Sequence, residues 1–168
     1  SYVGGALPFT VDFWGGLTNQ YLLGSNGLVG FGTFYGGLFT TGGQVVAPTA
    51  GRYGSFGTLP TFSGGQYQAP APAIYGLGID LFLGATGVCV ATVGTAPNRR
   101  WVAETYDAQI YMRPNVHLTF EVVANETPNN VFDVLYNTPW QTPDGTPFLA
   151  TDVTVGTQDF RVVAASLR

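Results

Sequence analysis

The chain has 168 residues, of which 45% are hydrophobic, with 24 glycines and 11 prolines, and this composition suits one β-rich domain over residues 1–168. It has no lysine, and its net charge is −4. Only 10% of its residues are charged, whereas soluble domains are about 25% charged. We therefore expect much of its surface to contact copies of itself or another large surface. Arg99 and Arg100 are the only adjacent basic residues, which argues against nucleic acid as a partner. No stretch approaches the roughly 18 uninterrupted apolar residues of a membrane span, which argues against such a span.

The first predicted strand covers residues 7–14, where apolar and other side chains alternate. One face carries Leu7, Phe9, Val11 and Phe13, and the other carries Thr10, Asp12 and Trp14. This is the pattern of a strand with one buried face.

Two further strands, 20–23 and 28–34, flank the sequence Gly24-Ser25-Asn26-Gly27. Asn-Gly supplies the positive φ that a tight hairpin turn demands. The segment therefore predicts a β-hairpin.

Residues 36–73 differ in character, with Gly-Gly pairs at 36–37, 42–43 and 64–65 and the sequence Ala69-Pro70-Ala71-Pro72. The segment is too rich in glycine for a central strand and too aromatic for a plain linker. We expect a long, ordered Gly/Pro-rich excursion that packs on its own sandwich or on a neighbour. A flexible surface loop is the alternative.

Eight more segments bounded by Gly, Pro, Asn or Asp are predicted as strands: 74–83, 88–93, 99–106, 109–112, 116–124, 131–136, 148–155 and 159–165. About ten strands in one domain predict an all-β fold, either a jelly-roll-like β-sandwich of two sheets or a barrel. Alternation in 116–124 is clean, with Leu118, Phe120, Val122 and Ala124 inward and His117, Thr119 and Glu121 outward.

Cys89 is the one cysteine, in the apolar run Val88-Cys89-Val90-Ala91, and is predicted as a small buried residue of the core. Downstream, the turn Thr95-Ala96-Pro97-Asn98 leads into a strand that places Arg100 on one face and Arg99 and Trp101 on the other. We expect one arginine to pair with a carboxylate such as Glu121 or Glu104. The alternative is an arginine that binds a ligand carboxylate or a neighbouring subunit.

Three stretches, in this order, resemble bacterial extracellular β-sandwich modules of nidogen-like character. Residues 25–32 (SNGLVGFG) resemble the SNGxxxFG hairpin of those modules, and residues 94–102 (GTAPNRRWV) resemble their GTAPNRR[FW]V turn and strand. Residues 118–123 (LTFEVV) resemble the strand TFEV that follows. The likeness covers residues 6–136 in outline.

The resemblance implies an extracellular β-sandwich used for surface display, adhesion or matrix building, and it supplies no catalytic residues. One segment departs from the family pattern. Where those modules carry the acidic sequence PFWDDL, this chain has residues 74–82, IYGLGIDLF, and retains the single aspartate Asp80.

Catalytic and metal-binding patterns find little support. His117 is the one histidine, in a strand among outward polar residues, and the chain has no Gly-x-Ser-x-Gly elbow. Nothing in the spacing sets two carboxylates across a cleft for glycoside hydrolysis. The aspartates at 133, 144, 152 and 159 lack the dense spacing of calcium loops. We expect no enzyme activity, cofactor or metal.

These features favour an extracellular structural subunit that assembles into a homopolymer, such as a filament, tube or surface layer. Missing lysines leave strand edges poorly guarded, and residues 1–14 could complete the sheet of the next copy. The alternatives are a cell-surface adhesin or carbohydrate-binding module, whose partners would be glycans or matrix, and a jelly-roll shell subunit. We expect a secreted chain processed at Ser1. The candidate contact residues are Tyr2, Val3, Trp14, Arg99, Arg100, Trp101 and Trp140.

Overall fold

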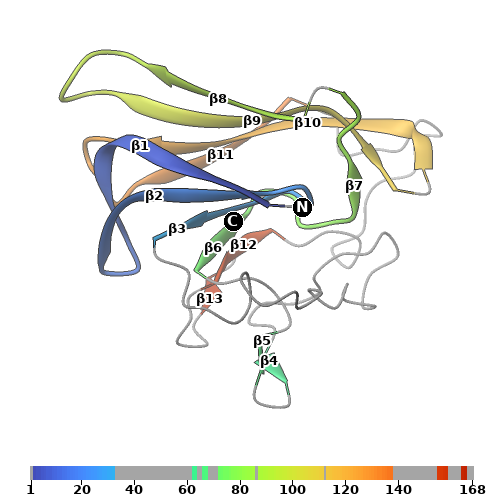
Figure 1. Ribbon diagram of the computed structural model, residues 1–168, viewed down its shortest axis with the longest axis horizontal. Coiled ribbons are helices and arrows are strands. Elements are labelled where there is room, and N and C mark those ends of the chain that lie inside the picture. The colour runs from blue at the N-terminus through green and yellow to red at the C-terminus, as the bar shows by residue number, and fades with distance from the viewer. Residues whose placement is uncertain are drawn as a thin grey trace.

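The computed structural model describes residues 2–32, 62–63, 66–67, 72–85, 87–111, 113–137, 155–158 and 164–165. Within these ranges the chain forms strands and no helix, so no segment of them is a helix that could cross a membrane. The strands build two antiparallel sheets that lie one above the other (Figure 1), with a separate two-stranded ribbon of β4 (Phe62–Ser63) and β5 (Gln66–Tyr67). The predicted all-β sandwich is confirmed.

The lower sheet in Figure 1 has six described strands in the order β1-β2-β3-β6-β12-β13. Their bounds are β1 (Tyr2–Phe13), β2 (Gly16–Gly24), β3 (Leu28–Phe31), β6 (Ala73–Tyr75), β12 (Gly156–Gln158) and β13 (Ala164–Ala165). Strand β1 buries the four apolar side chains that alternation predicted, Leu7, Phe9, Val11 and Phe13. Prediction and structure therefore agree on which face of β1 meets the core.

The upper sheet has the order β11-β10-β9-β7. Strand β8 also pairs with β9, along residues 100–105, whereas β7 pairs with residues 109–110. The bounds are β7 (Leu81–Phe82), β8 (Val88–Val93), β9 (Arg100–Ile110), β10 (Arg113–Asn125) and β11 (Phe132–Tyr136). On β10 the predicted inward residues Leu118, Phe120, Val122 and Ala124 are buried.

The core between the sheets consists of two clusters of buried side chains. The larger cluster joins β1 to β9 and β10 and contains a group of aromatic rings, among them Phe13, Phe31 and Trp101. The Phe31 and Trp101 ring centroids lie 6.1 Å apart in an edge-on arrangement, which is favourable for aromatic pairs. The smaller cluster includes Ile79, Ile110 and Phe120.

Residues 74–83 do not form the single strand that their pattern predicted. They form β6 in one sheet and β7 in the other, and residues 76–80 carry the chain between the sheets (Figure 1). The predicted hairpin of residues 20–34 is confirmed as β2 and β3. Its turn contacts the crossing segment, because the carbonyl of Gly27 accepts hydrogen bonds from the N–H groups of Gly76 (3.0 Å) and Leu77 (3.3 Å).

The predicted strands 99–106 and 109–112 are in fact one strand, β9. The break predicted between them is a β-bulge, since Tyr106 and Asp107 together face Thr119 of β10, and Asp107 has a φ of 51°. The bulge shifts the alternation by one residue, which keeps Thr105, Ala108 and Ile110 all buried.

The predicted burial of Cys89 is wrong. Strand β8 matches the predicted range 88–93, but Cys89 is exposed and so is every later residue of the strand. An apolar run is typical of a buried strand. Strand β8 departs from that rule because, of its residues, only Val88 packs against a core cluster, so the later side chains lie in solvent.

Several predictions fall on parts of the chain beyond the described ranges. These are Trp140, most of the 36–73 excursion and most of the predicted strands 148–155 and 159–165.

Candidate functional site

The arginine ion pair exists, but its partner differs from the predicted Glu121 or Glu104. Arg99 binds Glu126 with two side-chain contacts, Nη2 to Oε1 at 2.6 Å and Nε to Oε2 at 2.9 Å. The backbone N–H of Arg99 also donates to Oε2 at 3.0 Å, and the N–H of Glu126 donates to the carbonyl of Arg99. Arg99 lies just before β9 and Glu126 just after β10, so the pairing of these strands brings them together.

This pair is part of the fold. The guanidinium of Arg99 lies 5.6 Å from the centroid of the Phe9 ring, a cation–π contact that ties the loop to β1. The side-chain hydrogen bonds with Arg99 lower the pKa of Glu126, and those with Glu126 raise the pKa of Arg99. Arg99 therefore has a bidentate partner within its own chain.

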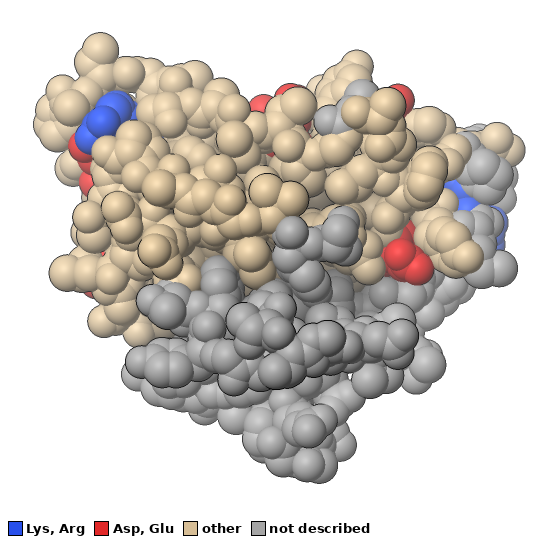
Figure 2. All heavy atoms as spheres, in the orientation of Figure 1, with Lys and Arg blue, Asp and Glu red and all other residues tan. Residues whose placement is uncertain are grey.

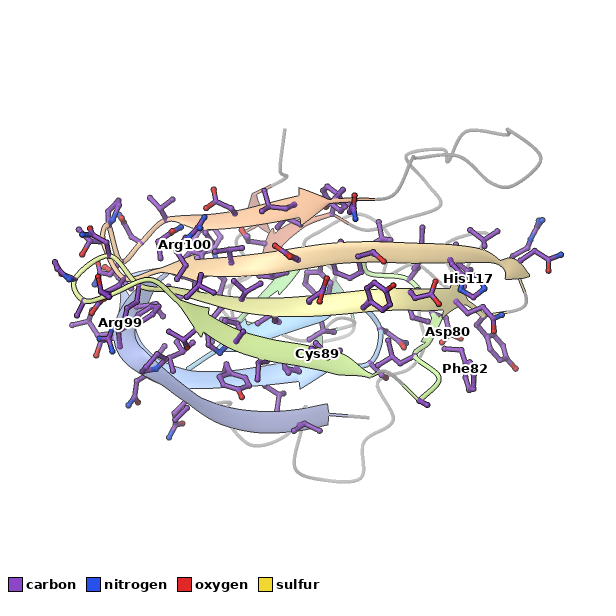
Figure 3. All side chains as sticks on the ribbon, turned by 90° about the horizontal axis from the view of Figure 1, so that it is seen from above. Asp80, Phe82, Cys89, Arg99, Arg100 and His117 are labelled. Carbon is purple, nitrogen blue, oxygen red and sulfur yellow. The ribbon has the colours of Figure 1, made fainter. Side chains whose placement is uncertain are left out.

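The neighbouring candidates divide between the two faces of β9 as predicted. Trp101 is buried and packs against Tyr21, with ring centroids 4.5 Å apart. Arg100 is exposed on the other face, opposite Asn125 of β10. Figure 3 shows both arginines at one end of the upper sheet and His117 at the other. Trp101 is thus a core residue.

Tyr2 and Val3 lie in β1 and pair with Gly24 and Leu23 of their own β2. Val3 is exposed. The first residues are therefore already part of a sheet within their own chain.

His117 lies on the outward face of the upper sheet with three carboxylates, Glu104, Asp107 and Glu121. Nδ1 of the exposed His117 is 3.0 Å from Oδ1 of Asp107, and Glu104 and Glu121 face each other across β9 and β10. In the part of the chain that the structure describes, no group of three or more His, Cys, Asp and Glu side chains could hold a metal.

Strand β8 is the most unusual surface element. Its sequence, Val-Cys-Val-Ala-Thr-Val, carries no charge and no proline, although Val90 is 44% exposed and Val93 is 42% exposed. One edge pairs with β9, and the second pairs with no strand among the described residues. Edge strands are normally protected by lysine, proline or a bulge. Strand β8 has no lysine or proline, and its register with β9 is unbroken from Val88 to Val93.

A pocket of about 390 Å³ opens between the two sheets near the β1–β2 turn. The end of β1 and its turn contribute residues 12–15, and the lower sheet adds Ile74 and Thr157. Strand β11 of the upper sheet contributes Phe132 and Val134, and the loop before it contributes Asn130. Oδ1 of Asp12 is buried out of reach of solvent and has no hydrogen-bond partner among the described residues. Sequence patterns placed Asp12 on the solvent face of a strand. The structure instead sets it against the loop before β11, where its backbone N–H donates to the carbonyl of Asn129 at 2.8 Å.

Sequence reasoning missed Asn130, Phe132 and Thr157, since they come together only when β11 and β12 take their places in different sheets. One local signal was available. Trp14-Gly15-Gly16 ends the alternating run, and a glycine pair after a strand indicates a tight turn. That signal would have placed Asp12 beside a turn.

Comparison with known proteins gives one family. The family model described as NIDO related matches residues 3–167. No curated protein and no solved structure matches the chain.

Proposed function

Because the chain belongs to the NIDO-related family, which supports the resemblance to nidogen-like modules, we propose that it is an extracellular β-sandwich subunit that assembles with copies of itself. The observation that carries this proposal is the uncharged, exposed edge of β8. A strand edge offers backbone N–H and C=O groups to another strand, and a chain without lysine lacks the commonest guard against such pairing.

The partner edge in the next copy is β11, at the other side of the same sheet. Leu135 is 50% exposed there. The strands β8, β9, β10 and β11 alternate in direction, so two copies in the same orientation would place β11 of one antiparallel to β8 of the next. Such a head-to-tail contact does not close on itself and therefore extends into a filament.

Each joint is weak when it stands alone. Stable interfaces bury about 1,200–2,000 Å² in total, and one pair of short strands supplies only part of this. We therefore expect dimers only at micromolar or higher concentration, with longer assemblies where other surfaces add to the contact. The low charge of the face seen in Figure 2, where acidic and basic side chains lie near the margins of its described part, favours such additional contacts.

Exchange of the N-terminal strand is a different route to the same assembly. It would require residues 2–6 to leave their pairing with β2, whereas the β8 edge needs no strand to move. Deletion of residues 1–6 distinguishes the routes, since edge pairing through β8 would survive the deletion.

Two lysine substitutions test the edge contact. Val90→Lys on β8 and Leu135→Lys on β11 should each abolish assembly in sedimentation velocity while the far-UV spectrum stays that of a folded β-protein. Leu17→Lys is the matched control. Leu17 is 72% exposed, but its strand β2 lies between β1 and β3 in the other sheet.

Mixing the variants tests the direction of the contact. Val90→Lys retains a competent β11 edge and Leu135→Lys retains a competent β8 edge, so an equimolar mixture should form one-to-one dimers and no polymer. Dimers in Leu135→Lys alone would indicate β8 pairing with β8 and a closed assembly. A wild-type chain that stays monomeric at millimolar concentration would overturn the proposal and favour the adhesin or carbohydrate-binding alternative.

A further inference from the structure

Three aromatic side chains lie exposed at one end of the upper sheet. Phe82 on β7 is 60% exposed, Tyr106 on β9 is 52% exposed and Tyr111, just after β9, is 57% exposed. No other aromatic side chain in the described ranges is exposed to this degree. Exposed rings forgo the free energy that burial would give, and exposed apolar groups that gather in one place mark interaction sites.

Strand pairing places these rings on the outward face of the sheet. Leu81 and Ile110 form a buried pair between β7 and β9. Because side chains alternate along a strand, the next pair, Phe82 and Gln109, points outward. Tyr111 lies two positions after Gln109 and is exposed. It is therefore diagonal to Phe82 on the same face, at a separation that aromatic side chains can bridge.

A β-bulge sets polar groups beside the rings. Tyr106 and Asp107 together face Thr119, and the N–H of Asp107 donates to Oγ1 of Thr119 at 3.0 Å. Oδ1 of Asp107 lies 3.0 Å from Nδ1 of His117, and His117 pairs with Gln109 in the next row of the sheet. Bulges re-aim side chains and are frequent next to functional sites. Here the bulge brings a carboxylate, an imidazole and an amide together on the face that carries the rings.

The charges at this end of the sheet have mixed signs. Figure 3 shows Asp80, Phe82 and His117 together at the end opposite the two labelled arginines. Asp80 and Asp107 carry negative charge, whereas Arg113 begins β10 with a positive charge. A polyanion needs several Lys or Arg side chains on one face, and the described residues here form no such cluster. The balance of signs favours an uncharged ligand.

We infer that this aromatic end, made up of Phe82, Tyr106, Gln109, Tyr111 and His117, binds a neutral oligosaccharide. A sugar ring has apolar C–H faces and a rim of hydroxyl groups. The faces stack on aromatic rings, whose negative π faces attract polarised C–H groups. The hydroxyl groups both donate and accept hydrogen bonds, which suits amide and imidazole side chains that also do both.

A protein partner fits this surface less well. The centre of a protein interface is depleted of charged residues, whereas the paired Asp107 and His117 lie on the same face as the rings. Small-ligand sites combine aromatic surfaces with a few placed polar groups, which is the combination found here. The inference is also independent of assembly, because edge pairing through β8 and β11 leaves the faces of the sheet uncovered.

The test titrates cellohexaose, mannohexaose and chitohexaose into the full chain, with hexagalacturonate as the acidic counterpart. Calorimetry gives the affinity and amide chemical shifts give the location. At least one neutral sugar should bind tenfold or more tightly than hexagalacturonate and shift the amide signals of residues 82, 106, 109, 111 and 117.

Three variants separate stacking from other effects. Tyr111→Ala should weaken binding of the preferred sugar at least fivefold, and Tyr111→Phe, which keeps the ring, should change it less than twofold. Leu17→Ala removes an equally exposed apolar side chain from the other sheet and should also change binding less than twofold. All three positions tolerate truncation in the fold, since the side chains lie in solvent.

Several results would overturn the inference. These are no shift from any of the three neutral sugars at millimolar concentration, equal binding of hexagalacturonate, or unchanged binding in Tyr111→Ala. A hydrophobic dye that shifts the same amides when no sugar does would assign the face to a protein partner instead. Val90→Lys, designed not to assemble, should bind the sugar as tightly as the wild type, and loss of binding there would place the site at the assembly contact.

Discussion

Arg99 illustrates how a single side chain joins three parts of this molecule. Its guanidinium binds Glu126 after β10 and lies over Phe9 of β1, while its own backbone leads into β9. The side chains of Arg99 and Glu126 are only 28% and 15% exposed, so the pair is shielded more than a typical surface pair. The bidentate geometry fixes both partners, which is the arrangement in which an ion pair contributes to stability.

The pair predicts a dependence of stability on pH. Since Arg99 lowers the pKa of Glu126 in the folded state, the stabilisation is present above the unfolded pKa, about 4.3, and is lost as pH falls through the lower folded value. The difference in free energy of unfolding between wild type and Glu126→Gln should therefore be largest at pH 7 and shrink below about pH 4. Urea unfolding at several pH values measures it.

The control for this series is Glu104→Gln, which removes a carboxylate from the outward face of β9. A difference between wild type and Glu126→Gln that stays constant from pH 7 to pH 3 would show that the charge of Glu126 contributes nothing.

At the scale of residues, sequence patterns succeeded where the environment is set by alternation alone. The opposite faces of Arg100 and Trp101 followed from the period of a strand. The partner of Arg99 did not, because Glu126 is distant in sequence and meets it only through strand pairing. The predicted burial of Cys89 was wrong for a related reason, since an apolar run does not reveal whether another sheet covers the strand.

At the scale of elements, two turn glycines show that the same backbone conformation can have different surroundings. Gly27 is close to the crossing segment that joins the sheets, and a Cβ atom there would overlap the carbonyl oxygen of Leu77. Gly15 has a similar φ, 77° against 75°, but a Cβ atom there would meet nothing within 4 Å. The two glycines therefore differ in surroundings and share a backbone conformation.

This contrast predicts different costs for the same substitution. Gly15→Ala should destabilise the protein by about 1 to 2 kcal/mol, the cost of a left-handed alanine. Gly27→Ala should cost about 3 kcal/mol or more, because it must also displace the crossing at residues 76–77. Urea unfolding of the two variants checks the difference, and equal costs would show that the crossing yields easily.

The crossing is also where sequence prediction of elements failed. Residues 74–83 have the apolar content of one strand, and nothing in the local sequence indicates that β6 and β7 belong to different sheets. The reason is topological. The segment is held by the turn after β2 and by the hydroxyl of Tyr136, which donates to the carbonyl of Gly76 and whose pKa is raised by burial. Such contacts are set by the packing of distant elements.

For the whole molecule, the two sheets separate a structural interior from a surface poor in charge. The class of fold was predictable because alternation and turn residues recur along the chain. The pocket was not predictable, since its lining comes from four separate segments of the chain, residues 12–15, 74, 130–134 and 157.

Assembly through β8 predicts a change in thiol reactivity. Cys89 is exposed on this strand and is the one cysteine of the chain, so its reaction with a disulfide reagent reports on a single place. We expect rapid reaction in dilute protein and at least fivefold slower reaction at concentrations where copies associate. Val90→Lys should react rapidly at every concentration. Unchanged reactivity in an assembled sample would place the contact elsewhere.

Strand β8 also bears on how such a module can diversify. Because both of its faces contact solvent from Cys89 to Val93, its side chains contribute little to the core, and the two-sheet interior does not constrain their identity. Substitutions there should leave folding almost unchanged while altering which strand edge they match. Related chains could therefore acquire separate pairing specificities on one scaffold, through changes in the five consecutive residues from Cys89 to Val93.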